Sequence, residues 1–420
     1  MSGNTGSVRN AERGFFPLDE ELELLPGSLT PHGHESLVRL SGWMPYEQAA
    51  GIIADLLGIQ VSKSMSQRYA EGAGAAYVQI QTEEVERIEK EMPTAPVGAD
   101  KIQVSADGAM VPLVHGQWAE VRTVVIGEVQ PKVEERGEWV VHTRNLSYFS
   151  RKMTAEEFTR LALVEIQRRG VENAKQVGAV MDGSDWLQGF SDHHCPHALR
   201  ILDFPHAGEH ISPIGEFLCG EGTLEMKQWV SERLHQLKHE GPAGLLAEFR
   251  DLQKQHPDEK AITGNLAYLE KRESQMQYPQ FQAQGWPIGS GIVESGNKLV
   301  VEARLKGSGM HWAGEHVNPM LAIRNILCSD RWKEDWPKVA ARLRQQNAHK
   351  RQTLHQARAS AESALTQQLL HQSPTVSDII QEQVPPEIVS PVLPDKPKPN
   401  RWSKFIYGRA LYQRPDLPKN

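Results

Sequence analysis

The sequence predicts an α/β fold in which a mixed sheet carries helices on its faces. The first observation is a set of three runs rich in β-branched and apolar residues, at 101–106 (KIQVSA), 110–114 (MVPLV) and 121–129 (VRTVVIGEV). Runs of this kind between turn residues predict antiparallel strands. The second observation is the alternation of helical and extended patterns that follows, which is typical of parallel strands joined by crossover helices.

The alternation begins with a helical pattern at 155–170, for which Thr154 is a candidate N-cap. A buried strand is expected at 175–181, then a helix at 186–194 and a strand at 198–202. The resulting order, βββαβαβ, predicts a sheet that combines antiparallel hairpins with parallel crossovers.

Helical periodicity also precedes this sheet. Pro45 opens a helical pattern that Gly58 ends, and Ser62 or Ser64 can cap a second helix. This outline is typical of a helix-turn-helix, whose second helix enters the DNA major groove, and it fits an ordinary helical hairpin equally well. The candidates for DNA contact on the second helix are Lys63, Ser66, Gln67 and Arg68.

We expect six segments along the chain. They are an N-terminal segment (1–34), a helical DNA-binding module with its linker helix (35–98), the first part of the sheet core (99–206), an all-helical insertion (207–286), the final core helix with a basic stretch (287–345) and a polar, Pro-rich tail (346–420). The linker helix is the charge-laced run at 83–92.

Composition and charge limit the classes of function. The net charge is -7 over 420 residues, so the chain is not a polycation that binds nucleic acid by bulk electrostatics. The segment 298–351 nevertheless holds 11 basic and 5 acidic residues, and any DNA contact is expected to be local. The sequence has no membrane-spanning run, secretory signal or nucleotide-binding Walker A motif, which predicts a cytoplasmic, nucleoid-associated protein without a nucleotide cofactor.

Three carboxylates are candidate metal ligands. Asp107 follows the first expected strand, Asp182 follows the fourth, and Glu294 opens the helix after a glycine-rich turn. Taken singly, they could be a hairpin turn, a helix cap and a favourable charge at a helix N-terminus. Taken together, they would repel one another unless a cation neutralised them. An oxygen-only ligand set favours Mg²⁺ or Mn²⁺, and two such ions could support phosphoryl displacement.

Basic and polar residues follow Glu294 on the same expected helix. α-Helical spacing places Asn297 and Lys298 on the same face as Glu294. Lys298 could therefore hold a phosphate, or it could form a surface ion pair with Glu294. The further candidates for DNA contact in this region are Arg304, Lys306 and Trp312, although core packing is the more common role of a tryptophan.

Four features combine into a recognisable pattern: Asp107 after a strand, Asp182 in the context AVMDGSDW, a D-x-x-H motif from Asp203 to His206, and the run GWPIGSGIVESGNKLVVEARLKGSGMHW at 285–312. Together with the helical insertion, they resemble the DDE transposases of bacterial insertion sequences. The narrower resemblance is to the Kra-type group, which is similar to Mutator-like enzymes with a C/D-x-x-H motif. It covers about residues 16–332 and leaves out the tail.

The resemblance implies an RNase H-like catalytic core in which Asp107, Asp182 and Glu294 bind two Mg²⁺ or Mn²⁺ ions. It assigns Asp203 and His206 to a motif that shapes the active site or contacts DNA, although His206 could also be a core histidine bonded to a backbone carbonyl. Such an enzyme binds the terminal inverted repeats of its element, cleaves DNA and joins the 3′-hydroxyl ends to target DNA. A homodimer or higher oligomer is expected, because two element ends must be held together.

Two other classes of function stay open, because one fold hosts several activities. A metal-dependent nuclease or junction resolvase would use the same triad without strand transfer, but the long insertion and the N-terminal module argue against it. A transposase-derived regulator would bind DNA without catalysis, and the intact triad disfavours it.

Overall fold

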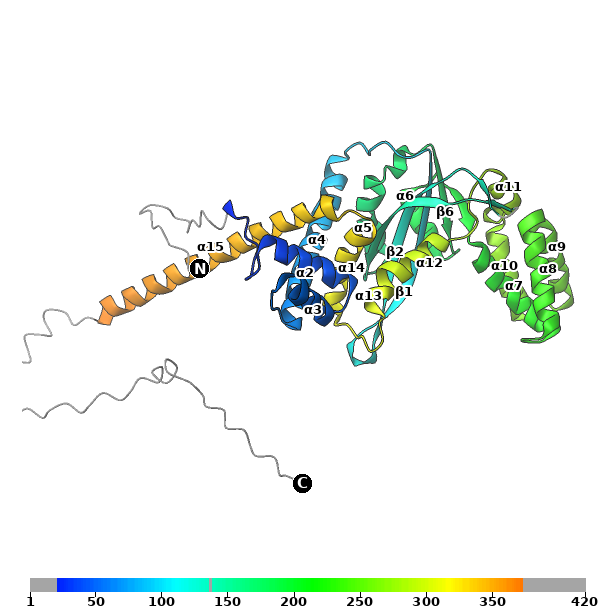
Figure 1. Ribbon diagram of the computed structural model, residues 1–420. Coiled ribbons are helices and arrows are strands. Elements are labelled where there is room, and N and C mark those ends of the chain that lie inside the picture. Colours follow the sequence, from blue (N-terminus) through cyan, green and yellow to red (C-terminus); the bar gives the residue numbers. More distant parts are fainter. Residues whose placement is uncertain (1–20, 136–137, 373–420) are drawn as a thin grey trace, which may run out of the picture. The chain divides into compact units, whose positions relative to one another are not determined.

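Five strands form one mixed sheet. They are β1 (Lys101–Pro112), β2 (Trp118–Val129), β5 (Thr143–Arg151), β6 (Gln176–Met181) and β7 (Leu199–Leu202). In the computed structural model, which describes residues 21–135 and 138–372, they lie in the order β5-β2-β1-β6-β7 (Figure 1). β2 is antiparallel to both β1 and β5, whereas β1, β6 and β7 run parallel. The mixed α/β fold expected from the sequence is therefore confirmed.

Two helices connect the later strands of the sheet. α5 (Ala155–Arg168) leads from β5 to β6, and α6 (Asp185–His194) leads from β6 to β7. α5 begins with a capping box, in which the Thr154 hydroxyl accepts from the Glu157 N–H and the Glu157 carboxylate accepts from the Thr154 N–H. The main sheet and its two crossover helices thus follow the expected order βββαβαβ.

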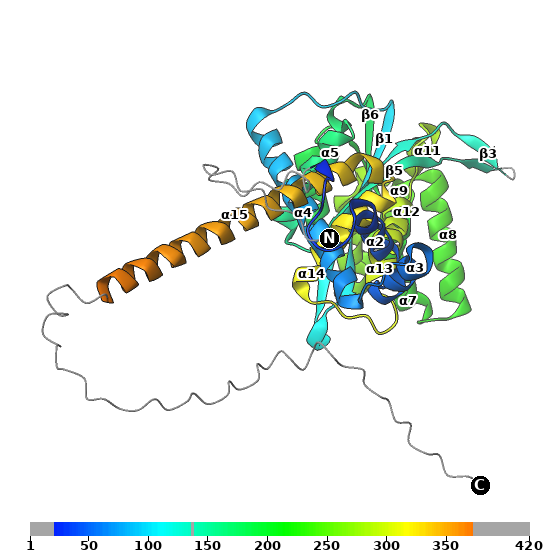
Figure 2. The same cartoon turned by 60° about the vertical axis from the view of Figure 1, so that its left-hand side comes forward.

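The first expected hairpin is wrong in its details. Asp107 and Gly108 do not form a turn, because β1 continues through them and Asp107 pairs with Thr123 of β2. The chain turns further on, at Val114–Gly116, where His115 has a φ of 60°. The third antiparallel strand is β5, which the sequence interpretation did not include. A small hairpin of β3 (Val133–Glu135) and β4 (Glu138–Val140) precedes β5 and stands apart from the main sheet (Figure 2).

Alternation along β1 separates the two faces of the sheet. Val104 and Ala106 are buried in a core shared with α5 and α6. Ala109 and Val111 instead belong to a core with the segments that follow the insertion, namely α12 (Gly291–Gly296), the π-helical turn η4 (Asn297–Glu302), α13 (Ala303–Leu305) and α14 (Gly314–Cys328). Successive side chains of a strand point to opposite faces, so Asp107 faces α12 and η4.

The segment between β7 and α12 is helical, as expected. Its helices are α7 (Phe204–Cys219), α8 (Leu224–Glu240), α9 (Pro242–Gln255), α10 (Lys260–Lys271) and α11 (Tyr278–Ala283). Figure 1 shows α7 to α10 grouped beside the sheet. Their apolar residues share one buried cluster with Ile201 and Leu202 of β7, so the insertion is joined to the sheet by a common core.

The N-terminal helices are α2 (Pro31–Trp43), α3 (Tyr46–Leu57) and α4 (Lys63–Glu91). Gly58 ends α3 in the left-handed conformation and the Ser62 hydroxyl caps α4, as expected. The expected second helix and linker helix are one continuous helix, α4, which lies against α14. Gly74 permits this close approach, because a Cβ there would collide with the Pro319 carbonyl.

The N-terminal helices share their core with the later part of the chain. Leu37 of α2 and Ala73 of α4 are buried in one cluster with Ile323 of α14 and Trp336 of α15 (Trp332–Gln372). The described residues up to His355 belong to one compact unit. The N-terminal helices thus share a buried core with α14 and the start of α15.

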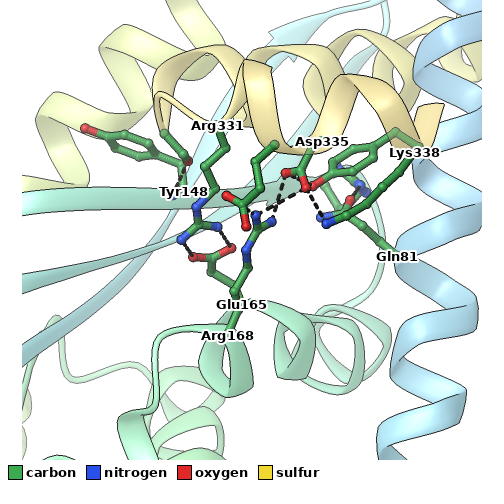
Figure 3. Close-up of polar contacts among 11 residues, drawn as sticks. Gln81, Tyr148, Glu165, Arg168, Arg331, Asp335 and Lys338 are labelled. Atoms are coloured by element: carbon green, nitrogen blue, oxygen red, sulfur yellow. Dashed lines mark hydrogen bonds and ion pairs between the residues drawn. The ribbon is translucent and has the colours of Figure 1, made fainter. Parts of the chain in front are cut away.

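A buried polar network joins these helices to α5. Asp335 at the start of α15 is 1% exposed and accepts hydrogen bonds from Tyr77 Oη at 2.7 Å, Arg168 Nη1 at 2.8 Å and Lys338 Nζ at 2.8 Å (Figure 3). Burial alone would raise the pKa of Asp335, but the hydrogen bonds from Arg168 and Lys338 lower it below its ordinary value. The network thus fixes α15 against α4 and α5.

We expect Asp335→Ala to lower the free energy of unfolding by about 3 kcal/mol, because it removes the buried acceptor of the Tyr77 hydroxyl and of Arg168 Nη1. The matched control is Glu334→Ala, whose side chain is 60% exposed and also pairs with Arg168, at 2.7 Å. It should cost less than about 1 kcal/mol. Urea unfolding measures both, and equal losses in the two variants would contradict the role given to Asp335.

Candidate active site

Asp107 and Asp182 lie close enough for their charges to interact. Val104 of β1 and Ala179 of β6 form the last pair of the parallel ladder between these strands, and each aspartate follows three residues later. β6 ends at Met181, so Asp182 begins a loop, whereas Asp107 lies within the longer strand β1. The expected adjacency of the two strands is confirmed.

The carboxylate of Asp107 is held in a fixed orientation. Its Oδ1 accepts from the Gly108 N–H at 2.6 Å, and its Oδ2 accepts from Asn297 Nδ2 at 3.1 Å. Burial, assisted by the negative charges of Asp182 and Glu294, raises the pKa of Asp107 to about 6, although its two hydrogen bonds act in the opposite direction. The charges of Asp182 and Glu294 therefore act on Asp107, near the point where β6 ends.

Glu294 reaches this site from α12. Gly296 lies directly on the sheet, since a Cβ there would come 2.8 Å from Val125 Cγ2. The π-helical turn η4 begins at Asn297, and turns of this kind are frequent at functional sites. Asn297 is 6% exposed and its amide donates to Asp107, so it is not available for DNA contact, whereas Glu294 and Lys298 are both exposed.

Asp203 of the D-x-x-H motif is a buried structural residue. Its N–H donates to the Met181 carbonyl at 2.8 Å, which continues the ladder between β6 and β7 beyond their ends. Its Oδ1 accepts from the Ser290 N–H at 2.6 Å, and its Oδ2 accepts from the His206 N–H at 3.1 Å. Asp203 thus ties the end of β6 and the start of α7 to the turn from which α12 and Glu294 begin.

His206 is not a fully buried core histidine. Its side chain is 30% exposed, and Nδ1 lies 3.0 Å from Glu209 Oε2. Its ring also contacts Tyr268 of α10 edge to face, with 6.3 Å between the ring centroids. The alternative in which His206 bonds a backbone carbonyl is not what the structure shows. His206 lies at the start of α7, where its ring contacts Glu209 of the same helix and Tyr268 of α10.

Several expected DNA contacts are buried and cannot reach DNA. The Ser66 hydroxyl donates to the Ser62 carbonyl at 3.2 Å, and the side chain has no exposed surface. Arg304 is 2% exposed and donates to the Ser41 carbonyl at 3.0 Å, with its guanidinium over the rings of Tyr46 and Trp312. Trp312 is 7% exposed. Arg304 and Trp312 pack α13 against the N-terminal helices, and Ser66 is bonded within α4, so the DNA contact expected of these three residues is wrong.

Other expected DNA contacts remain accessible. Lys63, Arg68 and Lys298 are exposed. Gln67 is half-buried and donates to Glu71 Oε1 at 2.8 Å, while Lys306 pairs with Glu302 at 2.8 Å. The accessible residues therefore come from the start of α4 and from η4.

The chemical type of the three carboxylates suits a hard divalent cation, but their side chains lie too far apart to bind one ion without moving. Three carboxylates and no thiolate or imidazole are the ligands that Mg²⁺ and Mn²⁺ prefer. However, no three His, Cys, Asp or Glu side chains in the described ranges stand close enough together to form a ready-made metal site. Burial, assisted by the charges of Asp182 and Glu294, raises the pKa of Asp107, and a bound cation would offset these effects.

The sequence analysis missed several side chains that support the site. Gln103 of β1 is fully buried, accepts from Thr143 Oγ1 at 2.7 Å and lies 3.5 Å from the Gly289 carbonyl in the turn before α12. The signal was available, because Gln103, Ser105 and Asp107 alternate along one strand and so share a face. Two further residues, Tyr268 and Arg272, come from the insertion and gave no comparable signal.

No known protein family matches the chain, and no curated protein matches it either. Among the helices that the structure describes, none combines the length and apolarity needed to cross a membrane.

We expect Asp107→Asn to stabilise the metal-free protein at pH 7.5. The folded-state pKa of about 6 lies above the ordinary value of 3.8, so stability contributed by the protonated form is lost as the pH rises from about 4 to 6. The amide of asparagine carries no charge, so the cost of burying the Asp107 charge near two other carboxylates disappears. After solvent screening, the gain in the free energy of unfolding should be about 1 kcal/mol. Urea unfolding in EDTA at pH 7.5 and pH 4 tests this: an advantage that is absent at pH 7.5, or as large at pH 4, would contradict it.

Proposed function

We propose that this protein is a metal-dependent DNA transposase with an RNase H-like core. The observation that carries the proposal is the electrostatic interaction of Asp107, on β1, with Asp182, directly after the parallel neighbour β6, and with Glu294 of α12. The resemblance of the sequence motifs to the DDE transposases of insertion sequences supports the same conclusion.

The sheet topology supports the RNase H-like part of the proposal. The first three strands of the main sheet form an antiparallel meander, and the last two are added in parallel beside the first strand. Acidic residues on the central strand and on its parallel neighbour are therefore brought together by the fold itself. The insertion enters after the last strand, before the helix that carries Glu294.

The proposed chemistry needs two bound Mg²⁺ or Mn²⁺ ions, which would lower the pKa of the attacking oxygen and stabilise the leaving oxygen in phosphoryl displacement. Asp107, Asp182 and Glu294 would hold these ions. The Gly108 N–H and the Asn297 amide orient the Asp107 carboxylate, and the Ser184 N–H, which donates to Asp182 Oδ1 at 2.7 Å, orients the second aspartate. Lys298 is exposed on η4 and is placed to bind a DNA phosphate.

DNA binding would use local positive surfaces of an otherwise acidic protein. Between Asp335 and Glu362 the sequence of α15 holds six lysine or arginine residues and no acidic residue. All side chains from residue 348 to 367 are exposed. Such a helix suits the phosphate backbone, whose contacts position a protein without specifying sequence. Lys63 and Arg68 at the start of α4 would contribute to recognition of the inverted repeats in a paired, at least dimeric complex.

The decisive experiment compares the wild type with Asp182→Asn on labelled DNA that carries the sequences flanking the gene. The wild type should cleave and join these ends with Mg²⁺ or Mn²⁺, and Asp182→Asn should lose both reactions because it removes a charge that the ions require. The matched control is Asp185→Asn, which changes an 85% exposed aspartate at the start of α6, three residues after Asp182, and should stay active.

The products separate the competing functions. Cleavage without joining would replace the transposase with a metal-dependent nuclease or junction resolvase. Specific DNA binding without either reaction would favour a regulator. Equal activity of wild type and Asp182→Asn would contradict the proposed site.

We expect the double substitution Lys350→Gln with Arg358→Gln to weaken DNA binding and to reduce its salt dependence. Each lost phosphate contact lowers the slope of log affinity against log salt by about 0.9, so the slope should fall by about two. The matched control is Lys227→Gln with Lys260→Gln, which removes two exposed lysines from the insertion. Fluorescence anisotropy with duplex DNA measures both, and an equal slope in the two double variants would contradict a role for α15.

A further inference from the structure

The helical insertion reaches back to the loop that carries Asp182. Gly183, the next residue, donates its N–H to Tyr268 Oη at 3.0 Å. Its carbonyl accepts from Arg272 Nε at 2.9 Å and also from Arg272 Nη2. Tyr268 lies in α10 and Arg272 directly after it, so both backbone groups of Gly183 are bound by one turn of the insertion.

The contact is close enough to require glycine at position 183. A Cβ there would collide with Arg272 Nε and with the Tyr268 hydroxyl. The requirement is for space, because Gly183 is not among the glycines with a left-handed φ. The Asp-Gly pair that the sequence shows after β6 therefore marks a place where another segment lies against the backbone.

The two side chains that hold Gly183 are themselves fixed. The Tyr268 ring stacks on His210 of α7, with 3.6 Å between the ring centroids and 17° between the planes. The Arg272 guanidinium lies 3.8 Å from the Tyr268 ring centroid and is buried, with the residue only 5% exposed. His210 Nδ1 in turn lies 2.8 Å from Asn265 Oδ1 of α10. The stack therefore joins α7 and α10 at the point where the insertion meets the loop.

Asp182 needs such support because it lies beyond the end of its strand. The parallel ladder fixes the backbone of β6 only to Met181, and the Asp182 side chain is anchored by a single local bond from the Ser184 N–H. Rotation of the peptide after Asp182 would change the direction of the carboxylate. A hydrogen bond at each end of Gly183 prevents that rotation.

We propose that Tyr268 and Arg272 are positioning residues, which hold the Asp182–Gly183 peptide so that the Asp182 carboxylate stays beside Asp107. This inference rests on the proposed function, in which Asp182 holds a metal ion. The insertion then contributes to the geometry of the metal site as well as to the surface of the protein. Outer residues that orient a ligand in this way commonly change metal affinity about 10–100-fold when they are replaced.

The test measures Mn²⁺ binding to the full chain by isothermal titration calorimetry, and the Mg²⁺ concentration that half-saturates DNA cleavage. Tyr268→Phe keeps the ring and its stacking but removes the acceptor of the Gly183 N–H, and Arg272→Lys removes the two-point contact with the Gly183 carbonyl. Each should weaken Mn²⁺ binding by about tenfold or more and raise the half-saturating Mg²⁺ concentration in proportion. Excess Mg²⁺ should restore the rate, and the KM for DNA should not change.

The matched control is Lys271→Gln, which removes an exposed charge from the same turn and should bind Mn²⁺ like the wild type. Variants that unfold at lower temperature but bind Mn²⁺ with wild-type affinity would overturn the inference, because the two residues would then be structural only. A wild type that binds no Mn²⁺ and shows no metal-dependent cleavage would overturn the proposed function as well. Normal wild-type binding with unchanged binding in both variants would overturn the inference alone.

Discussion

The buried charge of Asp107, close to two other carboxylates, is the constraint on which the candidate site depends. Burial raises the pKa of Asp107, and the negative charges of Asp182 and Glu294 add to this effect. A protein offsets such a cost with hydrogen bonds to the charged groups, with protons or with cations. Here the Gly108 N–H and the Asn297 amide bind the Asp107 carboxylate, and the Ser184 N–H binds that of Asp182, yet the pKa of Asp107 remains raised.

Segments that are distant in the sequence support this arrangement. Asp203 ties the end of β6 to the turn before α12, and Gln103 reaches the same turn from within the sheet. The insertion holds Gly183 through Tyr268 and Arg272. On the α14 side, the guanidinium of Arg324 is buried and donates to the Gly42 and Val300 carbonyls, which links α14 to both α2 and η4. The face of the sheet that bears Asp107 is therefore covered by α12, η4 and α14, and α14 is bonded in turn to α2.

The presence of a mixed sheet and of the strands β1, β2, β6 and β7 could be predicted because these elements depend on local patterns. β-Branched runs, the cap at Thr154 and the stop at Gly58 each report on a few neighbouring residues. The same local view failed at Asp107 and Gly108, which are typical turn residues but are held within β1 by pairing with β2. It also missed β5, whose polar start (TRN) hides the buried residues that follow.

Tertiary contacts decide the rest and leave little trace in a single sequence. Arg304 looks like a DNA ligand because it is cationic and close to Glu294, yet it is buried beneath the N-terminal helices. Asn297 looks like its neighbour Lys298, yet it is buried and donates to Asp107, whereas Lys298 is exposed. Tyr268 and Arg272 lie almost 90 residues from Gly183, and only the folded insertion shows that they meet the loop of Asp182.

The central claim is that Asp107 and Asp182 share a divalent cation site, and anomalous diffraction from crystals soaked in MnCl₂ tests it most directly. The account predicts anomalous density between the two carboxylates, with Glu294 drawn toward it, and no such density in Asp182→Asn crystals under the same conditions. Manganese bound only elsewhere, or equal density in the variant, would contradict the account.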